Sequence, residues 1–391
     1  MFFRTGGIWF ALVLVGLVAW AEPQAALVME FDTGRVLYAQ RADQEWPPAS
    51  LAKMMLSYVV LDAVAAGKVS LETPIRASAL AARTGGSQVY LREGEIFPLG
   101  ELMAAIEIAS ANDASVAVAE GVFGSVEAAV QQMNAKAQAL GLEKTRFVNV
   151  HGLPESDPNG DRITAREAAV LARALLRDHP EVLHWTATVH APFRGGKFRL
   201  YSTNAHFLSR FPGADGLKTG YHSRARYNLV ATAVREGMRL IAVVLGCNSS
   251  RDRTEAASAL LEDAFRRYER RVILRTGDSL PDLVYVGGSR EEYVPLIVRE
   301  PLVLALPRTA WTAVRFVPRG VPLLEAPVSV GDPAGELVAL LDGEEVGSVP
   351  LSVGRSVDPA PVWWRLLHQD PPPEERLKPR TSQTPTREPA Q

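Results

Sequence analysis

The fold is decided by the stretch WPPASLAKMML, residues 46–56, in which a serine and a lysine stand where an apolar helix begins. Proline restricts the chain before Ser50 to an extended path, and serine is a preferred N-cap, so the pattern predicts a helix starting at Ser50. Lys53 has almost only apolar neighbours, so it needs a partner or a shifted pKa. Residues three apart share a helix face, which brings the Ser50 hydroxyl and the Lys53 amine together.

The composition is that of a globular chain with room for two or three domains, since 391 residues are 47% hydrophobic and 22% charged. A net charge of -2 argues against a nucleic-acid-binding surface, and none is expected. The chain has seven histidines but no H-E-x-x-H motif or Cys/His cluster, so we expect no metal and no cofactor. Cys247, the single cysteine, is predicted to be a buried structural thiol.

The N-terminus has the features of an export signal. Arg4 precedes an apolar run over 8–18, and Ala19-Trp20-Ala21 has the small-x-small pattern of a cleavage site. This run of about a dozen residues is short for a spanning helix, which needs about 20. We therefore expect residues 1–21 to be a cleaved signal and the mature protein to be exported to the periplasm or cell surface; a retained anchor is the alternative.

Residues 22–271 are predicted to form one α+β domain. Two hairpins are expected, over 26–40 with a turn at 32–34 and over 226–247 with a turn at 235–237. Between and after them, apolar periodicity predicts helices over 99–120, 126–140, 164–177 and 253–268. Strands at both ends with helices between them favour an antiparallel sheet and a helical cluster.

The chain changes character after residue 271. Short apolar runs broken by Gly and Pro about every eight to twelve residues predict a small all-β sandwich over 272–358. Residues 359–391 are expected to be a short Trp-rich amphipathic patch, VWWRLLH, followed by a disordered Pro-rich tail. The patch either contacts a membrane surface weakly or packs on the sandwich.

Two more short motifs lie in the first domain. IASANDASVAVAE contains Ser110 and Asn112, and GADGLKTGYHS contains Lys218-Thr219-Gly220. Each alone has a structural explanation, as a helix bend or a strand end. S-x-x-K, S-x-N and K-T-G in this order are the signature of serine acyl-transferases of the penicillin-binding and β-lactamase type.

The chain resembles a D-alanyl-D-alanine carboxypeptidase of the low-molecular-mass penicillin-binding class over almost the whole mature length. The resemblance is carried by these phrases: TGRVLYAQRADQEWPPASLAKMM, GGSQVYLREGE, AIEIASANDASVAVAE, NVHGL, GADGLKTG, MRLIAVVLG, PLLEAPVSVGDPAGEL and GSVPL. It implies a β-lactamase/transpeptidase-like catalytic domain followed by a β-sandwich. It also implies removal of the terminal D-alanine from peptidoglycan pentapeptides, with β-lactams as covalent inhibitors.

The resemblance assigns roles to the motif residues. Ser50 is the expected nucleophile, and Lys53 its base if burial and Lys218 keep the amine neutral. Ser110 is expected to relay a proton between the amines and the leaving group, and Asn112 to hold the substrate amide.

The substrate-binding residues also follow from the resemblance. The backbone N–H groups of Ser50 and Tyr221 would form an oxyanion hole beside Gly220. Thr219 and an arginine would hold the terminal carboxylate; Arg251 and Arg253 are both available, and position favours Arg253. His151 and Ser87 match positions that line the site.

Two departures from the family pattern stand out. Tyr221 follows K-T-G where the family usually has histidine, and His222 comes one step later. Ile163-Thr164-Ala165 replaces the usual Ser-Thr-Ala helix start, and Glu155 lacks the context of a deacylating glutamate. The alternatives to a carboxypeptidase are a β-lactamase, an endopeptidase that cuts crosslinks, or a catalytically silent cell-wall scaffold.

Overall fold

The computed structural model describes residues 22–154, 160–291, 293–367 and 377–379. The expected export signal, Glu155 and most of the expected disordered tail lie outside the described residues. The chain divides into two compact units. The first unit consists of the described part of Met1–Val28 together with Tyr38–Ala233 and Ile241–Leu261. The second consists of Met29–Leu37, Val234–Leu240 and the described part of Glu262–Gln391.

A five-stranded sheet brings the early and late strands of the α+β region together, in the order β2-β1-β9-β8-β7. Its strands are β1 Ala25–Glu30, β2 Val36–Gln40, β7 Ala214–His222, β8 Arg226–Arg235 and β9 Met238–Cys247. The two predicted hairpins are confirmed. All residues of β1 are buried, and because neighbouring strand residues face opposite sides, the sheet is covered on both faces.

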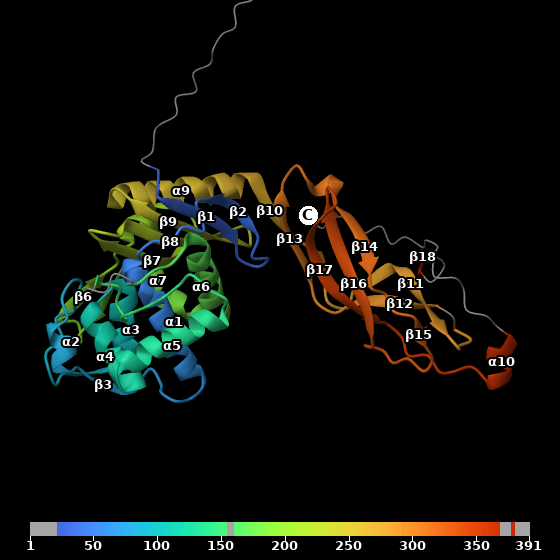
Figure 1. Ribbon diagram of the computed structural model, residues 1–391, viewed down its shortest axis with the longest axis horizontal. Helices are drawn as coiled ribbons and strands as arrows, with labels where there is room; N and C mark the ends of the chain where they lie inside the picture. Colours follow the sequence, from blue (N-terminus) through green and yellow to red (C-terminus); the bar gives the residue numbers. More distant parts are fainter. Residues whose placement is uncertain (1–21, 155–159, 292, 368–376, 380–391) are drawn as a thin grey trace, which may run out of the picture. The chain divides into compact units, whose positions relative to one another are not determined.

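Helices supply that cover (Figure 1). Helix α9 runs along one face of the sheet, and the other helices of this region gather beyond the opposite face. The helices of the whole region, α9 included, are η1 Ala49–Leu51, α1 Ala52–Ala65, α2 Ala79–Arg83, α3 Leu99–Ile108, α4 Asn112–Phe123, α5 Val126–Ala139, α6 Ala165–Asp178, η2 Pro180–Val182, α7 Leu183–Thr186, α8 Ala205–Arg210 and α9 Ser250–Arg267. The antiparallel sheet with a helical cluster is the predicted α+β arrangement.

The predicted helix over 99–120 is wrong in one respect, because the structure divides it into α3 and α4. Ser110 between them has φ +58°, a left-handed conformation that an α-helix cannot contain. The apolar periodicity runs through this break, since Ile108 and Ala111 on its two sides are both buried. The interruption releases the Ser110 side chain from the helix surface.

The other predicted helices are confirmed within a few residues. The Ser125 hydroxyl accepts a hydrogen bond from Ala128 N at the start of α5, and the Thr164 hydroxyl accepts one from Glu167 N at the start of α6. Such caps satisfy backbone donors that the first helical turn leaves open. The structure adds two small antiparallel strand pairs that periodicity did not predict, β3 Pro74–Arg76 with β4 Ile96–Pro98 and β5 His190–Phe193 with β6 Phe198–Tyr201.

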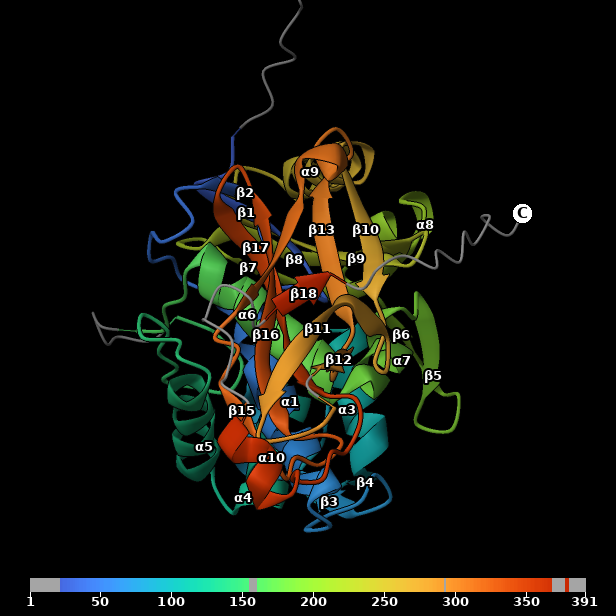
Figure 2. The same ribbon diagram turned by 90° about the vertical axis from the view of Figure 1, so that its right-hand side faces the viewer.

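The sandwich region that follows α9 is all-β up to residue 358, apart from the 3-10 turn Trp311–Ala313, as predicted. Strand β10 pairs antiparallel with β13, and a larger sheet has the order β14-β16-β17-β12-β11-β15, with β18 on β11. Figure 2 shows β16 and β17 as a long pair. The strands are β10 Tyr268–Leu274, β11 Ser279–Gly287, β12 Tyr293–Val298, β13 Leu302–Pro307, β14 Arg315–Arg319, β15 Leu324–Glu325, β16 Pro333–Leu341, β17 Glu344–Val353 and β18 Leu377–Pro379.

The two sheets of this region share one apolar core. Leu302, Leu304 and Leu306 alternate along β13, and all three belong to the same buried cluster as Leu296 of β12 and Leu351 of β17. This alternation is the pattern of a strand with one buried face. The boundary that we place at 271/272 falls inside β10 and stays a prediction.

The Trp-rich patch forms the short helix α10, Val362–Leu367. Leu366 is 81% exposed and Leu367 74%, whereas the Trp363 ring, 59% exposed, lies with its centroid 5.6 Å from the guanidinium carbon of Arg290 in the sandwich. Within the residues that the structure describes, none of the helices combines the length and apolar character needed to cross a bilayer.

Candidate active site

Ser50 lies in the 3-10 turn η1, which leads directly into α1. The expectation that Ser50 caps the helix is wrong, because Leu51 is the N-cap of α1 and no side chain caps it. Ala49, just before the serine, has φ +50°, an unfavourable conformation for a residue with a Cβ. Ser50 is half-buried, and its hydroxyl, not used as a cap, faces Lys53.

Lys53 is fully buried one turn into α1. Its Nζ lies 3.0 Å from Ser50 Oγ and donates to Asn112 Oδ1 at 2.6 Å and to the His151 carbonyl at 3.1 Å. Burial is the main cause that lowers the pKa of Lys53 well below its usual value, and the charge of Lys218 lowers it further. The Lys53 amine therefore lies beside the Ser50 hydroxyl, as the three-residue spacing predicts.

A second buried pair joins strand β7 to the break between α3 and α4. Lys218 on β7 is 1% exposed, and its Nζ donates to Ser110 Oγ at 2.8 Å and to the Thr219 carbonyl at 3.2 Å. Burial lowers the pKa of Lys218 to about 8, and Arg253 lowers it as well, whereas Glu107 acts to raise it. The structure therefore brings together all five expected catalytic side chains, which are Ser50, Lys53, Ser110, Asn112 and Lys218.

The loop with Ser87 fixes Asn112 from outside. Asn112 N donates to the Ser87 carbonyl at 2.7 Å, and Asn112 Nδ2 donates to the Gly85 carbonyl at 2.7 Å. A Cβ on Gly86 would lie 2.5 Å from Asn112 Nδ2, so only glycine lets the loop approach this closely. Ser87 itself is exposed, and its printed contact with the site is made by its main chain.

The loop around His151 contacts both Lys53 and the turn before Ser50. Gly152 has φ +78°, and a Cβ there would lie 1.9 Å from the Ala49 carbonyl oxygen. The His151 ring accepts a hydrogen bond from Leu153 N at Nδ1, and burial is the main cause that lowers its pKa to about 4. His151 thus presents a main-chain oxygen to Lys53 and has a ring that is neutral at pH 7.

Strand β7 carries the K-T-G motif past η1. A Cβ on Gly220 would lie 2.6 Å from the Pro48 carbonyl oxygen and 3.3 Å from Ser50 N, so glycine is required for this approach. Tyr221 follows with a side chain that is 54% exposed, and its ring lies 4.3 Å from that of Tyr227 on β8. Tyr221 thus lies in the strand beside Ser50, but its ring faces out of the core.

Arg253 lies behind the K-T-G motif, whereas Arg251 does not. The Arg253 side chain is 7% exposed, with Nη1 3.5 Å from the Gly220 carbonyl and Nη2 3.4 Å from the Thr203 carbonyl. The Thr203 hydroxyl in turn forms a hydrogen bond of 2.6 Å with the Thr219 hydroxyl. Arg251 is 82% exposed and pairs with Glu255 at 2.6 Å.

The bonds to Arg253 are long, and its Nε is buried with no hydrogen-bond partner among the described residues. Burial is the main cause that lowers the pKa of Arg253 to about 10, so the guanidinium stays charged at pH 7. A buried cation with weak partners gains most from an anionic ligand.

Sequence reasoning missed three polar residues that shape the site. Asn228 on β8 donates from Nδ2 to the carbonyls of Pro47 at 2.9 Å and Pro48 at 3.1 Å, which anchors the turn before Ser50. Thr203 positions Thr219, as described above, and Glu107 lies buried behind the two lysines. Asn228 and Glu107 each interrupt an apolar run, which was a signal available in the sequence.

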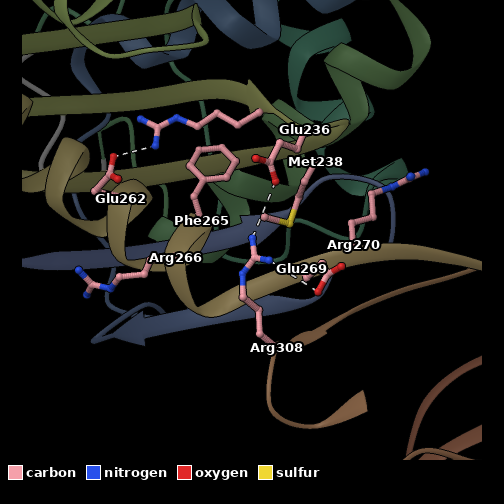
Figure 3. Close-up of a pocket in the computed structure, with 9 residues that line it drawn as sticks. Glu236, Met238, Glu262, Phe265, Arg266, Glu269, Arg270 and Arg308 are labelled. Atoms are coloured by element: carbon pink, nitrogen blue, oxygen red, sulfur yellow. Dashed lines mark hydrogen bonds and ion pairs between the residues drawn. The ribbon is translucent and has the colours of Figure 1, made fainter. Parts of the chain in front are cut away.

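A cavity of about 240 Å³ in the second unit is lined by arginines and glutamates together with Met238 and Phe265, and Figure 3 shows Arg308 between Glu236 and Glu269. Arg235 pairs there with Glu262 at 2.8 Å. Across the described residues, no group of His, Cys, Asp and Glu has the arrangement of a metal site. Cys247 is buried, and burial raises the pKa of its thiol to about 12, which makes it a poor nucleophile.

Two family models match the chain. Residues 19–249 match the peptidase S11 family of D-alanyl-D-alanine carboxypeptidases, and residues 268–359 match the C-terminal domain of penicillin-binding protein 5. D-alanyl-D-alanine carboxypeptidase DacF of Bacillus subtilis is 34% identical over 335 residues, which are 85% of this chain and 85% of that protein.

Solved structures give the same assignment. Penicillin-binding protein 5 from Haemophilus influenzae is 30% identical and has a TM-score of 0.78, over 86% of this chain and 98% of that chain. Penicillin-binding protein D2 from Listeria monocytogenes, in its ampicillin-bound form, is 31% identical with a TM-score of 0.57, over 62% of this chain and 97% of that chain.

These comparisons confirm the resemblance found in the sequence and the predicted fold class, a transpeptidase-like α+β domain followed by an all-β domain. The protein is a serine peptidase with D-alanyl-D-alanine carboxypeptidase function and acts on peptidoglycan. The chain belongs to the peptidase S11 family of D-alanyl-D-alanine carboxypeptidases.

Proposed function

We propose that this carboxypeptidase acts through an acyl-enzyme on Ser50 and removes the terminal D-alanine of peptidoglycan pentapeptides. The observation that carries the proposal is the placement of Lys53 Nζ 3.0 Å from Ser50 Oγ, in a fully buried position. A neutral amine has two N–H donors and one lone pair. Asn112 Oδ1 and the His151 carbonyl accept the two donors, which leaves the lone pair for the Ser50 hydroxyl.

In the acylation step, Ser50 Oγ attacks the carbonyl carbon of the penultimate D-alanine while its proton passes to Lys53. The C–N bond to the terminal D-alanine then breaks, and a proton from Lys218 reaches the leaving amine through Ser110. Transfer of one proton from Lys53 to Lys218 restores the resting charges. Water cleaves the ester in the second half-reaction, which releases the shortened peptide and regenerates the Ser50 hydroxyl.

The remaining site residues hold the substrate. We assign the oxyanion hole to the backbone N–H groups of Ser50 and Tyr221, a role that does not depend on the Tyr221 side chain. Arg253 and Thr219 bind the terminal carboxylate, supported by the burial and weak partners of the guanidinium. The approach of Gly220 to Ser50 keeps this strand within reach of the substrate backbone.

Asn112, Ser87 and His151 line the remaining walls of the site in this proposal. Asn112 accepts one bond from Lys53 and donates one to the Gly85 carbonyl, so one Nδ2 hydrogen and one Oδ1 lone pair remain for a substrate amide. Ser87 would contribute its exposed hydroxyl from the rim. His151 would act through its carbonyl and through a ring that carries no charge at pH 7.

β-Lactams are the expected covalent inhibitors, because they imitate the acyl-D-Ala-D-Ala backbone and meet the same Ser50. The ampicillin-bound structure of the Listeria monocytogenes relative supports this extension to the present chain. The expected cellular location is the periplasm or cell surface, with residues 1–21 as an export signal. The exposed apolar side chains of α10 favour weak contact with a membrane surface over packing on the sandwich.

We divide the chain for this function into a signal at 1–21, a catalytic domain at 22–271, a β-sandwich at 272–358 and a tail at 359–391. The two family matches, to 19–249 and 268–359, support a division close to this one.

Product identification tests the proposal. The purified protein is incubated with a linear pentapeptide, with a crosslinked peptide dimer and with penicillin, and D-alanine and peptide products are identified by mass spectrometry. We expect D-alanine from the pentapeptide, a stable penicillin adduct, and loss of both in Ser50→Ala. Rapid penicillin turnover would indicate a β-lactamase, cleavage of the dimer alone an endopeptidase, and a folded protein without any product a scaffold.

A further inference from the structure

The proposed mechanism leaves one buried charge unused, the carboxylate of Glu107. It lies in the last turn of α3 and is 4% exposed, between the buried residues Ile106 and Ile108. Glutamate is rarely buried unless it is paired, because removing a carboxylate from water is costly. Within the described part of the chain, Glu107 forms no direct ion pair, so its burial needs another explanation.

Its position is set by the two elements that carry the active-site amine and hydroxyl. The Ser57 hydroxyl donates to Glu107 Oε1, and Ser57 lies four residues after Lys53, on the same face of α1. Glu107 itself lies three residues before Ser110 in the chain. The bond from Ser57 therefore holds the carboxylate against the face of α1 that carries Lys53.

The charged groups that act on Glu107 are Lys218 on β7, first, and Lys53 on α1. Helix α4 also packs on α3, but its Asp113 accepts hydrogen bonds from backbone N–H groups at 3.0 Å and 2.9 Å. His184 on α7 and His190 on β5, which also contact α3, are exposed and do not act on Glu107.

Glu107 acts on both lysines and raises the pKa of each. Asp113 adds to this effect at Lys53, whereas Arg253 opposes it at Lys218. Two ammonium groups buried side by side would repel each other, and one carboxylate can stabilise one of them. The order of the interactions favours Lys218, since Glu107 is its strongest charge partner, whereas Lys218 is the strongest charge partner of Lys53.

We propose that Glu107 is a positioning residue that keeps the Lys218 ammonium beside Ser110 and thereby leaves the Lys53 amine unprotonated. This inference rests on the proposed function of Ser50 and Lys53. Burial, the largest cause, lowers the pKa of Lys218 and Arg253 lowers it further, while the charge of Glu107 acts to raise it; with all three the pKa is about 8. Burial raises the pKa of Glu107 too, while Lys218 and the Ser57 hydroxyl lower it, so carboxylate and ammonium titrate as a pair.

The test is the pH dependence of acylation by a chromogenic β-lactam in Glu107→Gln. The amide has nearly the same size and still accepts from Ser57, so the variant removes the charge alone. Without the carboxylate the Lys218 ammonium is less stable and loses its proton at lower pH. The alkaline limb, which is the fall of the acylation rate at high pH, therefore moves to lower pH by about one unit. The rate on the alkaline side then falls about tenfold at a given pH.

Three variants separate this role from a structural one. Glu101→Gln removes a charge from the first turn of the same helix that does not act on either lysine, and it leaves the limb in place. Glu107→Asp keeps the charge and has a limb closer to that of the original protein than Glu107→Gln. Ser57→Ala keeps the carboxylate but removes its hydrogen bond. It lowers the melting temperature, and it moves the alkaline limb less than Glu107→Gln does.

An alkaline limb of Glu107→Gln that superimposes on that of the original protein overturns the inference, even if the variant melts earlier. Should this variant not fold, Glu107→Met, which also removes the charge at similar volume, is measured in its place, and an unmoved alkaline limb there is equally contrary. These failures differ from failure of the proposed function, in which the original protein itself forms no β-lactam adduct at Ser50.

Discussion

The Nζ atom of Lys53 on α1 lies 2.6 Å from Oδ1 of Asn112, the residue with which α4 begins after the break at Ser110. This bond joins the S-x-x-K motif to the S-x-N motif and holds the amine in place beside Ser50. It also uses one amine donor on a neutral acceptor, so it does not require the amine to be charged.

Replacement of Lys53 by methionine should abolish most of the acylation. Methionine fills a similar volume in the buried site but cannot accept the Ser50 proton, and a general base contributes about 10²- to 10⁴-fold. The measurement is the rate of β-lactam adduct formation, with circular dichroism as the check on folding. A folded Lys53→Met protein that acylates within about twofold of the original rate would exclude Lys53 as the base.

The pH profile of D-alanine release should be bell-shaped. Activity falls as pH decreases through the lowered pKa of Lys53, because the base becomes protonated. It falls again as pH rises through about 8, because Lys218 then loses the proton that the leaving amine needs. The profile of kcat/KM from pH 4 to 10 measures both limbs, and a rate still rising above pH 9 would contradict the role of the Lys218 ammonium.

Arg253→Lys should reduce kcat/KM for a peptide with a free C-terminal carboxylate by about 10- to 100-fold, the value of a lost charge-assisted bidentate contact. A peptide with an amidated C-terminus should be affected much less. Arg251→Lys is the matched control, because Arg251 is 82% exposed and pairs with Glu255. If Arg253→Lys lowered kcat/KM equally for both peptides, or if Arg251→Lys lowered it more, Arg253 would not be the residue that binds the terminal carboxylate of the substrate.

Gly152→Ala should destabilise the protein by roughly 3 kcal/mol or more, from left-handed strain and a collision with the Ala49 carbonyl. The relevant control is Gly141→Ala, since Gly141 also has a positive φ, of +72°, but open space around its missing Cβ. Urea unfolding measures both losses. Equal destabilisation of the two variants would show that the close approach at Ala49 is not needed.

Replacing Trp363, Leu366 and Leu367 of α10 by serine should remove binding to anionic lipid vesicles. Each of these exposed side chains can bury apolar surface in an interface, worth about 1.5–3 kcal/mol when burial is complete. Co-sedimentation measures the bound fraction, and D-alanine release from a soluble peptide should stay unchanged. Equal sedimentation of the variant and the original protein would remove the membrane role of α10.

Local sequence rules account for part of the site. Ser50 and Lys53 are three residues apart, so helical geometry alone predicts that they meet. The contact between Lys218 and Ser110 joins residues that are 108 apart in the chain. No periodicity predicts such a pair, and only the order of the three motifs, through the family resemblance, indicated it.

The errors have a common physical origin. The left-handed Ser110 and the turn that contains Ser50 are maintained by long-range contacts, such as those of Gly152 with Ala49 and of Asn228 with Pro48. Apolar periodicity continues on both sides of Ser110, and serine is common at helix starts. Local rules therefore predict an uninterrupted helix through Ser110 and a cap at Ser50. The sandwich was simpler to predict, because its strands alternate over one core.

The most direct measurement of the central claim is the mass of the protein after reaction with penicillin, followed by peptide mapping. The account predicts an increase by the whole β-lactam, located on the peptide that contains Ser50 and absent from Ser50→Ala. An adduct that persists in Ser50→Ala, or one that maps to another peptide, would contradict it.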